Sequence, residues 1–237
     1  MPKIHVVPRK EDLHQERLAD KVVLVLDVLF ATSTIVTVLA KGAREVIPAL
    51  DETDARAQAG LNGACLLAGE KNIRTISGFA SPLPLALLRE NPAHRSIIYS
   101  TTNGTVALRQ AAGAAAVYAA ALLNGAAAVQ RVITAHPEQT VLIVCAGSGG
   151  SMNLEDFYGA GYLVDLLQNA RRDYDCSDAA RAARMLYQHT DAGECLLASR
   201  IGRIISDMGH AEEVRFAARK SEFDAVPVLR NGRLQLY

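Results

Sequence analysis

Short apolar runs alternate with helix-like segments along the first two thirds of the chain, and this alternation limits the possible folds more than any other feature. Lys21–Asp27 (KVVLVLD) is a continuous run rich in valine, which is typical of a strand buried on both faces of a parallel sheet. Because strands alternate with helices, the pattern predicts an α/β fold with three layers, α/β/α, around a mostly parallel sheet. The other predicted strands are residues 44–50, 65–70, 96–100, 115–121 and 140–145.

The last third of the chain has a different pattern. Residues 177–219 are helical in character throughout, and AVPVLRNGRLQLY then predicts a hairpin with Asn231 and Gly232 at its turn. No linker of biased composition and no internal repeat interrupts the 237 residues. We therefore expect one α/β domain over residues 1–237, with a helical C-terminal subregion that ends in the hairpin.

Composition excludes several classes of protein. Lys plus Arg is 25 and Asp plus Glu is 25, so the net charge is zero, which argues against a protein held to nucleic acid by bulk charge. No apolar run reaches the ~18 residues of a membrane helix, and the first residues lack the apolar core of a signal peptide. The four cysteines form no C-x-x-C pair. We expect a cytoplasmic protein with no nucleic-acid or membrane partner.

Polar residues gather where the predicted strands end. Asp27 ends the first run, Glu70 ends CLLAGE, and the sequence TTNGT (residues 101–105) follows SIIYS. The sequence CAGSGG (residues 145–150) ends the last run, and Glu155 and Asp156 begin the next helix. In open parallel sheets, ligands bind outside the carboxyl ends of the strands, so these groups predict a site there.

Four of these residues are carboxylates and therefore candidate metal ligands. Oxygen ligands suit Mg²⁺, so the sequence predicts Mg²⁺ as cofactor, held by Asp27, Glu70, Glu155 and Asp156. Each residue also has a simpler interpretation. Asp27 could cap the following helix, Glu70 could form a loop salt bridge, and Glu155 and Asp156 could stabilise a helix N-terminus through its dipole.

Three segments suit an anion. The hydroxyls, the amide and the glycines of TTNGT, ATST (residues 31–34) and GSGG (residues 147–150) lie where backbone N–H groups are free. Helix capping alone would also explain each of them. The predicted ligands of an anionic small-molecule substrate are Thr32, Ser33, Thr34, Thr102, Asn103, Gly104 and Gly147.

Other chemistries were weighed at the same residues. The chain lacks G-x-x-x-x-G-K-[ST], which excludes a P-loop. AGSGG imitates a nucleophile elbow, so Ser148 could serve a serine hydrolase with His189 or His210 as base. Cys145 is a candidate catalytic residue beside Asp27 and Glu70. A cysteine at the end of an apolar strand is, however, more often a small buried hydrophobic residue than a nucleophile.

Several segments together resemble the 2-phosphosulfolactate phosphatases. They are DVLFATSTIVTVL, LLAGE, STTNGTVAL, VCAG followed by LEDFYGAG, SRIGRIISDMG and FDAVPVLRNGRL. The resemblance covers residues 21–236 and implies a three-layer α/β/α fold with Mg²⁺-dependent hydrolysis of a phosphate ester. The implied substrate is phosphosulfolactate, a small sulfonated acid on the route to coenzyme M or sulfolactate. A homodimer is expected on the same basis.

The chain departs from that family at two places. Phe30 stands where the family usually has arginine, a natural bidentate phosphate ligand. The segment Gly78–Pro84 lacks the aspartate, the Gly-Asn pair and the glutamate of the family's loop. These losses predict weak turnover of phosphosulfolactate. Three alternatives stay open: another phosphate ester, a catalytically silent anion-binding protein of the same fold, and the serine hydrolase.

Overall fold

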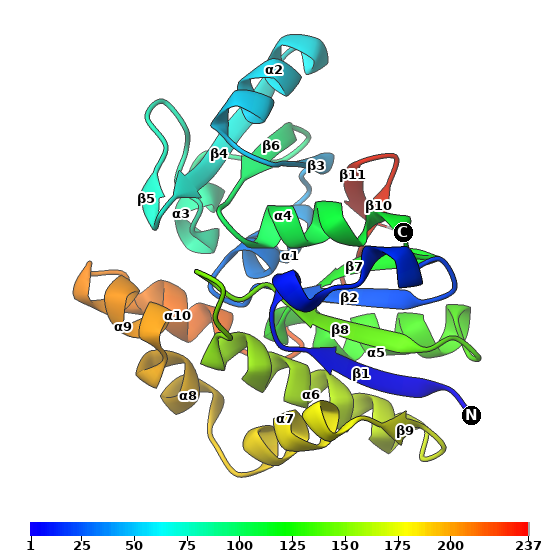
Figure 1. Ribbon diagram of the computed structural model, residues 1–237. Helices are drawn as coiled ribbons and strands as arrows, with labels where there is room; N and C mark the ends of the chain where they lie inside the picture. The colour runs from blue at the N-terminus through cyan, green and yellow to red at the C-terminus, as the bar shows by residue number, and fades with distance from the viewer. Residues whose placement is uncertain (237) are drawn as a thin grey trace.

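The computed structural model describes residues 1–236, and its centre is a sheet of eleven strands (Figure 1). The strand order is β5-β4-β6-β3-β11-β10-β7-β2-β8-β1-β9. The six predicted strands are all present, within one or two residues of their expected ends. The strands are β1 Lys3–Val7, β2 Val22–Leu26, β3 Glu45–Ala49, β4 Cys65–Lys71, β5 Arg74–Thr75, β6 Ser96–Ser100, β7 Ala116–Ala120, β8 Val141–Cys145, β9 Asp175–Cys176, β10 Pro227–Arg230 and β11 Arg233–Leu236.

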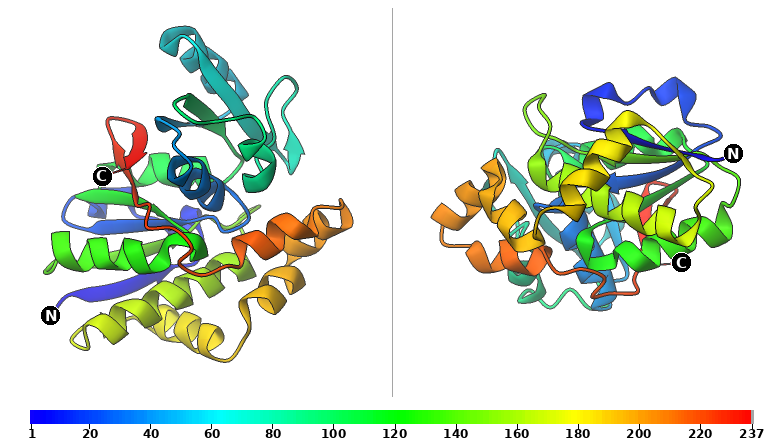
Figure 2. Two further views of the ribbon diagram at one scale, coloured as in Figure 1. Left: turned by 180° about the vertical axis from the view of Figure 1, so that it is seen from behind. Right: turned by 90° about the horizontal axis from the view of Figure 1, so that it is seen from below.

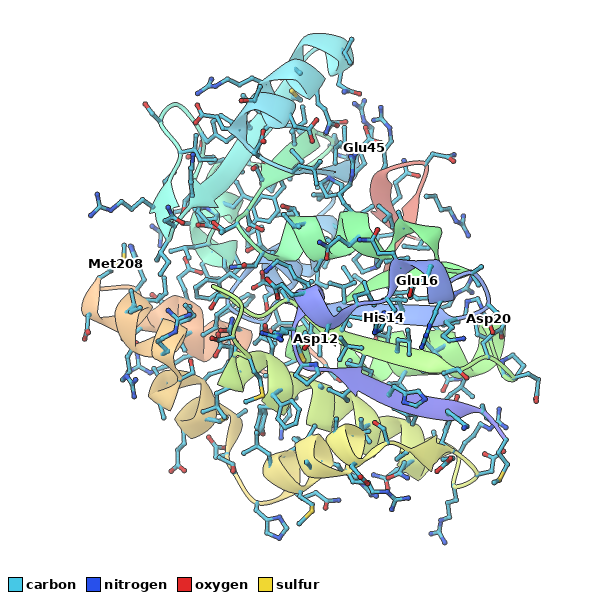
Figure 3. All side chains as sticks on the ribbon, in the orientation of Figure 1. Asp12, His14, Glu16, Asp20, Glu45 and Met208 are labelled. Carbon is cyan, nitrogen blue, oxygen red and sulfur yellow. The ribbon has the colours of Figure 1, made fainter. Side chains whose placement is uncertain are left out.

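The C-terminal hairpin lies in the middle of this sheet and joins two parallel groups. Strands β4, β6 and β3 form one group and β7, β2, β8, β1 and β9 form the other, while β10 and β11 pair antiparallel with β7 and β3. The predicted turn is confirmed, since Asn231 (φ 50°) and Gly232 (φ 75°) both adopt the left-handed conformation of a tight hairpin. Arg233 also binds the buried carboxylate of Glu45 on β3 at 2.7 Å, beside the hairpin in Figure 3.

Helices cover both faces of the sheet, as the alternation of strands and helices predicts. Val22, Leu24 and Leu26 of β2 pack in one core with α5 and α6, whereas Val23 and Val25 pack in another with α1 and α4. The helices are α1 Ala31–Ala40, α2 Glu52–Asn62, α3 Pro84–Leu88, α4 Gly104–Gln110, α5 Gly125–Ala135, α6 Leu154–Ala170, α7 Asp178–Gln188, α8 Ala192–Ala198, α9 Arg200–Asp207 and α10 Ala211–Ala217.

Helices α8, α9 and α10 lie beyond the carboxyl ends of the strands rather than on the sheet (Figures 1 and 2). The carboxylate of Glu213 on α10 accepts hydrogen bonds from the backbone N–H groups of Leu85 (2.8 Å) and Ala86 (2.9 Å), so this helical subregion is tied to the first turn of α3. No helix within residues 1–236 is both long and apolar enough to cross a membrane.

The sequence analysis missed the strand β1, which pairs in parallel with both β8 and β9. Its five residues, KIHVV, alternate between exposed or partly buried positions and the buried residues Ile4 and Val6. Lys3 and His5 interrupt the apolar run, so the segment lacks the continuous pattern of the central strands. The chain therefore begins inside the sheet, and the loop after β1 reaches the strand ends where the polar residues gather (Figure 1).

Candidate active site

A cavity of about 320 Å³ lies where the loops after β2, β4, β6 and β8 meet helix α9. The hairpin separates β2 from β6 in the sheet, yet the twist of the strands brings their carboxyl ends together. The loop after β6 touches the loop after β2 directly. Gly104 lies so close to Asp27 that any Cβ atom at position 104 would overlap Oδ2 of the carboxylate. Of the residues discussed from the sequence, those that line the cavity are Asp27, Phe30, Glu70, Thr102, Asn103 and Ser148.

Asp27 is buried at the floor of this cavity, with 7% of its surface exposed. Burial, together with the negative charge of Glu70, raises its pKa to about 7, although a hydrogen bond from the backbone N–H of Ala31 acts in the opposite direction. Asp27 therefore faces the cavity and also stabilises the first turn of α1. The carboxylate of Asp27 is therefore both a helix cap and a side chain of the site, and it loses its proton near neutral pH.

Glu70 lies across the cavity and is held by backbone and hydroxyl donors rather than by a salt bridge. Its Oε1 accepts from the N–H of Thr102 at 2.6 Å, and its Oε2 accepts from the Thr102 hydroxyl at 3.1 Å and from the N–H of Ile73 at 2.7 Å. These bonds connect the β4–β5 turn to the loop after β6. The carboxylate is thereby fixed in orientation at the edge of the cavity.

Lys10 was not identified from the sequence, and it supports the cavity from behind Asn103. Its Nζ donates to Asn103 Oδ1 at 2.8 Å and lies 3.3 Å from the carbonyl oxygen of Ala146. Because the lysine must face the amide oxygen, the amide NH₂ of Asn103 is left to donate elsewhere. The positive charge of Lys10 also lowers the pKa of Asp27. No sequence motif marks this residue; it is placed by the loop after β1.

Arg200 lines the cavity, and it begins α9 within the segment SRIGRIISDMG. Its guanidinium donates to the hydroxyl of Ser148, and that hydroxyl donates to Asn153 Oδ1 at 2.7 Å. Within residues 1–236, no histidine contacts Ser148. His189 instead bonds the carbonyl oxygen of Met185, so the geometry offers no base for a serine hydrolase at this position.

Asp156 connects two of the loops that form the cavity and does not line it. Its Oδ1 accepts from the N–H of Val28 at 2.8 Å and its Oδ2 from the N–H of Gly147 at 3.2 Å. Burial and the charges of Asp27 and Glu155 raise the pKa of Asp156 well above its usual range, while the two N–H donors favour the ionised form. The carboxylate thus fixes the loops after β2 and β8 relative to each other.

Glu155, the other carboxylate at the start of α6, is buried outside the cavity lining. Its Oε1 has no hydrogen-bond partner, and burial raises its pKa against the opposing effects of Ser199 and Arg200. Cys145 is fully buried at the end of β8, and burial raises the pKa of its thiol well above its usual range. A neutral thiol without access to the cavity is a poor nucleophile.

The hydroxyls of the ATST segment are already used within the protein. Thr32 bonds the backbone of Asp27, Ser33 donates to the carbonyl of Val28, and Thr34 donates to the carbonyl of Pro82. None of the three lines the cavity. They shape the turn that presents Asp27, and Thr34 fixes the Gly78–Pro84 segment, whose residues Pro82 and Leu83 do line the cavity.

The four predicted metal ligands do not converge on one point. No group of three or more His, Cys, Asp or Glu side chains within residues 1–236 is arranged to hold a metal ion. Mg²⁺, however, is commonly bound by one or two carboxylates, with water and substrate phosphate oxygens completing its shell. Asp27 and Glu70 face the same cavity, and the negative charge of Glu70 raises the pKa of Asp27. A cation bound between them would offset this repulsion. These two residues fit Mg²⁺ in that role.

The position of Asp156 leads to a prediction about stability. Replacing it with alanine leaves two buried N–H groups without acceptors, which we expect to lower the free energy of unfolding by roughly 2–4 kcal/mol. Urea denaturation of the metal-free protein measures this change. Unchanged stability combined with loss of Mg²⁺ affinity would instead identify Asp156 as a metal ligand.

Comparisons with known proteins agree with this geometry. The sequence model described as 2-phosphosulpholactate phosphatase matches residues 7–232. Three similar proteins carry the name probable 2-phosphosulfolactate phosphatase. They come from Clostridium beijerinckii (29% identity, 98% of each chain covered), Caldanaerobacter subterraneus (35%, with 93% of this chain and 92% of the relative covered) and Symbiobacterium thermophilum (37%, with 93% and 96% covered).

Proposed function

We propose that this chain, which belongs to the 2-phosphosulpholactate phosphatase family, hydrolyses the phosphate monoester of a small organic acid and requires Mg²⁺ to do so. The relatives named above suggest a substrate of the 2-phosphosulfolactate type. The observation that carries the proposal is the cavity itself, whose lining combines the carboxylates of Asp27 and Glu70 with the guanidinium of Arg200 and the free amide of Asn103.

The polar residues of the cavity fall into two groups, one suited to a cation and the other to an anion. Asp27 and Glu70 would hold Mg²⁺, which when bound supplies positive charge to the phosphoryl oxygens. The amide NH₂ of Asn103 and the guanidinium of Arg200 are donors directed at an anion in the same cavity. Phosphoryl transfer depends largely on positioning and charge stabilisation, so this arrangement is sufficient for attack by water on phosphorus.

Lys10 acts through Asn103 in this proposal. Its hydrogen bond to Oδ1 fixes the amide so that the NH₂ group faces the substrate, and its charge favours the ionised form of Asp27. Asp156 acts similarly on the backbone by holding the loops after β2 and β8 in place. Neither residue needs to touch the substrate.

Release of inorganic phosphate tests the proposed function. The purified protein would be incubated with a panel of small phosphate monoesters that includes 2-phosphosulfolactate, with Mg²⁺ and with a chelator. We expect release that depends on Mg²⁺ for at least one ester. Mg²⁺-independent release would contradict the metal role, and tight binding of the esters without any release would identify a silent anion-binding protein.

The role of Asn103 gives a second prediction. Asn103→Ala removes one hydrogen bond to a charged phosphoryl group, which is worth roughly 1.5–3 kcal/mol. We expect kcat/KM to fall by about 10- to 100-fold in the phosphate-release assay. Asn62→Ala, on the far end of α2, is a suitable control that leaves the cavity intact. Unchanged kinetics in Asn103→Ala would place this residue outside the site.

A further inference from the structure

One wall of the cavity is apolar, and it adjoins Glu70 and Arg200. It is built from the turn after β2, the β4–β5 turn, the start of α3 and helix α9. A site that bound only small, fully charged groups would gain nothing from such a surface, because apolar area is stabilised by contact with apolar ligand atoms. The residues that form the wall are Phe30, Ile73, Leu83, Ile201 and Ile205.

Ile73 has an unusual backbone conformation for its residue type. It occupies the second position of the two-residue turn between Lys71 and Arg74, with φ at 70°, and Asn72 before it has φ at 52°. Such turns favour asparagine followed by glycine. A β-branched side chain is strained in the left-handed region, and residues held this way are concentrated at functional sites.

The backbone role of Ile73 does not account for its side chain. Its N–H donates to Glu70 Oε2 at 2.7 Å, and any residue other than proline would make this bond. A glycine would make it without strain. What isoleucine adds is a branched apolar surface that lines the cavity and packs against the neighbouring core.

We infer that Ile73 and Phe30 form a specificity wall that binds an apolar substituent on the organic part of the phosphate ester. The inference rests on the proposed phosphatase function for the identity of the anion. The phosphoryl group lies by Thr102 and Asn103, and the rest of the ester extends along the wall towards α9. The preferred substrates are therefore phosphate monoesters that carry a short alkyl or aryl group.

Alkylphosphonates test the wall without requiring hydrolysis. Calorimetric titration with methylphosphonate and butylphosphonate, in the presence of Mg²⁺, compares the same anion with and without three further methylene groups. Each methylene that leaves water strengthens binding by about fourfold, so we expect butylphosphonate to bind the unmodified protein about 10- to 60-fold more tightly.

Two variants of the same turn isolate the side chain. Ile73→Gly removes the apolar side chain together with its backbone strain, and should reduce the ratio of the two affinities by about 5- to 10-fold. Arg74→Ala alters an exposed residue at the end of the same turn that does not line the cavity, and it should leave the ratio unchanged. Equal affinities in the unmodified protein, or an unchanged ratio in Ile73→Gly, would overturn the inference and show that Ile73 only packs against the core.

The same experiments separate failure of the wall from failure of the proposed function. Phosphate release without any preference for the longer alkyl chain contradicts the wall alone. A strong preference for butylphosphonate without release of phosphate from any ester supports the wall and contradicts the phosphatase function.

Discussion

Replacing Asp27 with asparagine is expected to lower Mg²⁺-dependent phosphate release by about 10²–10³-fold, the loss typical of removing one group that stabilises charge in a transition state. The variant keeps an oxygen that can accept from the N–H of Ala31, so the first turn of α1 is preserved. What it loses is the negative charge that would hold the cation beside Glu70. Steady-state kinetics and calorimetric Mg²⁺ binding measure the two effects separately.

The stability of the same variant provides an independent test. The pKa of Asp27 is about 7 in the folded protein, above its ordinary value of 3.8, so ionisation of this group destabilises the fold progressively as pH rises from about 4 to 7. Asparagine cannot ionise. We expect metal-free Asp27→Asn to be more stable than the unmodified protein by about 4 kcal/mol at pH 8, with the difference vanishing near pH 4.

One outcome would contradict this account of Asp27. A large fall in stability with normal Mg²⁺ affinity would show that the residue serves only to cap α1. Asp51→Asn is the matched control, since Asp51 caps α2 through the N–H of Asp54 and is exposed. This control should leave Mg²⁺ binding unchanged.

The sequence predicted the layers of the fold because their signals are local. Strands such as VVLVL are buried on both faces and read as continuous apolar runs, and the Asn231-Gly232 turn specifies its own geometry. The place of the hairpin within the sheet was not predictable in this way. It depends on long-range pairing of β10 with β7 and of β11 with β3, through single bridges that leave no local pattern.

The candidate site was predictable to a similar extent. Asp27 directly follows β2, Glu70 lies near the carboxyl end of β4 and Asn103 lies in the loop after β6, so the carboxyl-end rule located them. The rule could not distinguish side chains that face the cavity from those, such as Thr32 and Asp156, that bond the surrounding backbone. Side chains that face the cavity and side chains that bond the backbone are of the same residue types and occupy equivalent positions after the strands, so the sequence does not distinguish them.

Residues from outside the strand–helix units were missed for a different reason. Lys10 bonds Asn103 from the loop after β1, and Arg200 lines the cavity from the first residue of α9. Ile73 belongs to a turn in which an apolar residue has no local advantage. Their contribution appears only when tertiary structure places them together.

The second large effect is expected at Phe30, which lines the cavity and is 7% exposed. Phe30→Arg places a cation where the ring packs now, and a hydrogen bond to a charged group is worth roughly 1.5–3 kcal/mol. We therefore expect kcat/KM for 2-phosphosulfolactate to rise by about 10- to 100-fold, while the preference for butylphosphonate falls. Phosphate release and calorimetry on the same preparation measure both changes.

The direction of the change at Phe30 decides between two accounts of the cavity. Phe30→Met retains an apolar side chain without charge and is the matched control, which should leave turnover of 2-phosphosulfolactate unchanged. If the unmodified protein already hydrolyses this ester efficiently and Phe30→Arg brings no gain, the sulfonate is bound by Arg200 and the apolar ring has no influence on it. If only the arginine variant gains activity, the ring at position 30 is what turns the site from a sulfonated towards an apolar substrate.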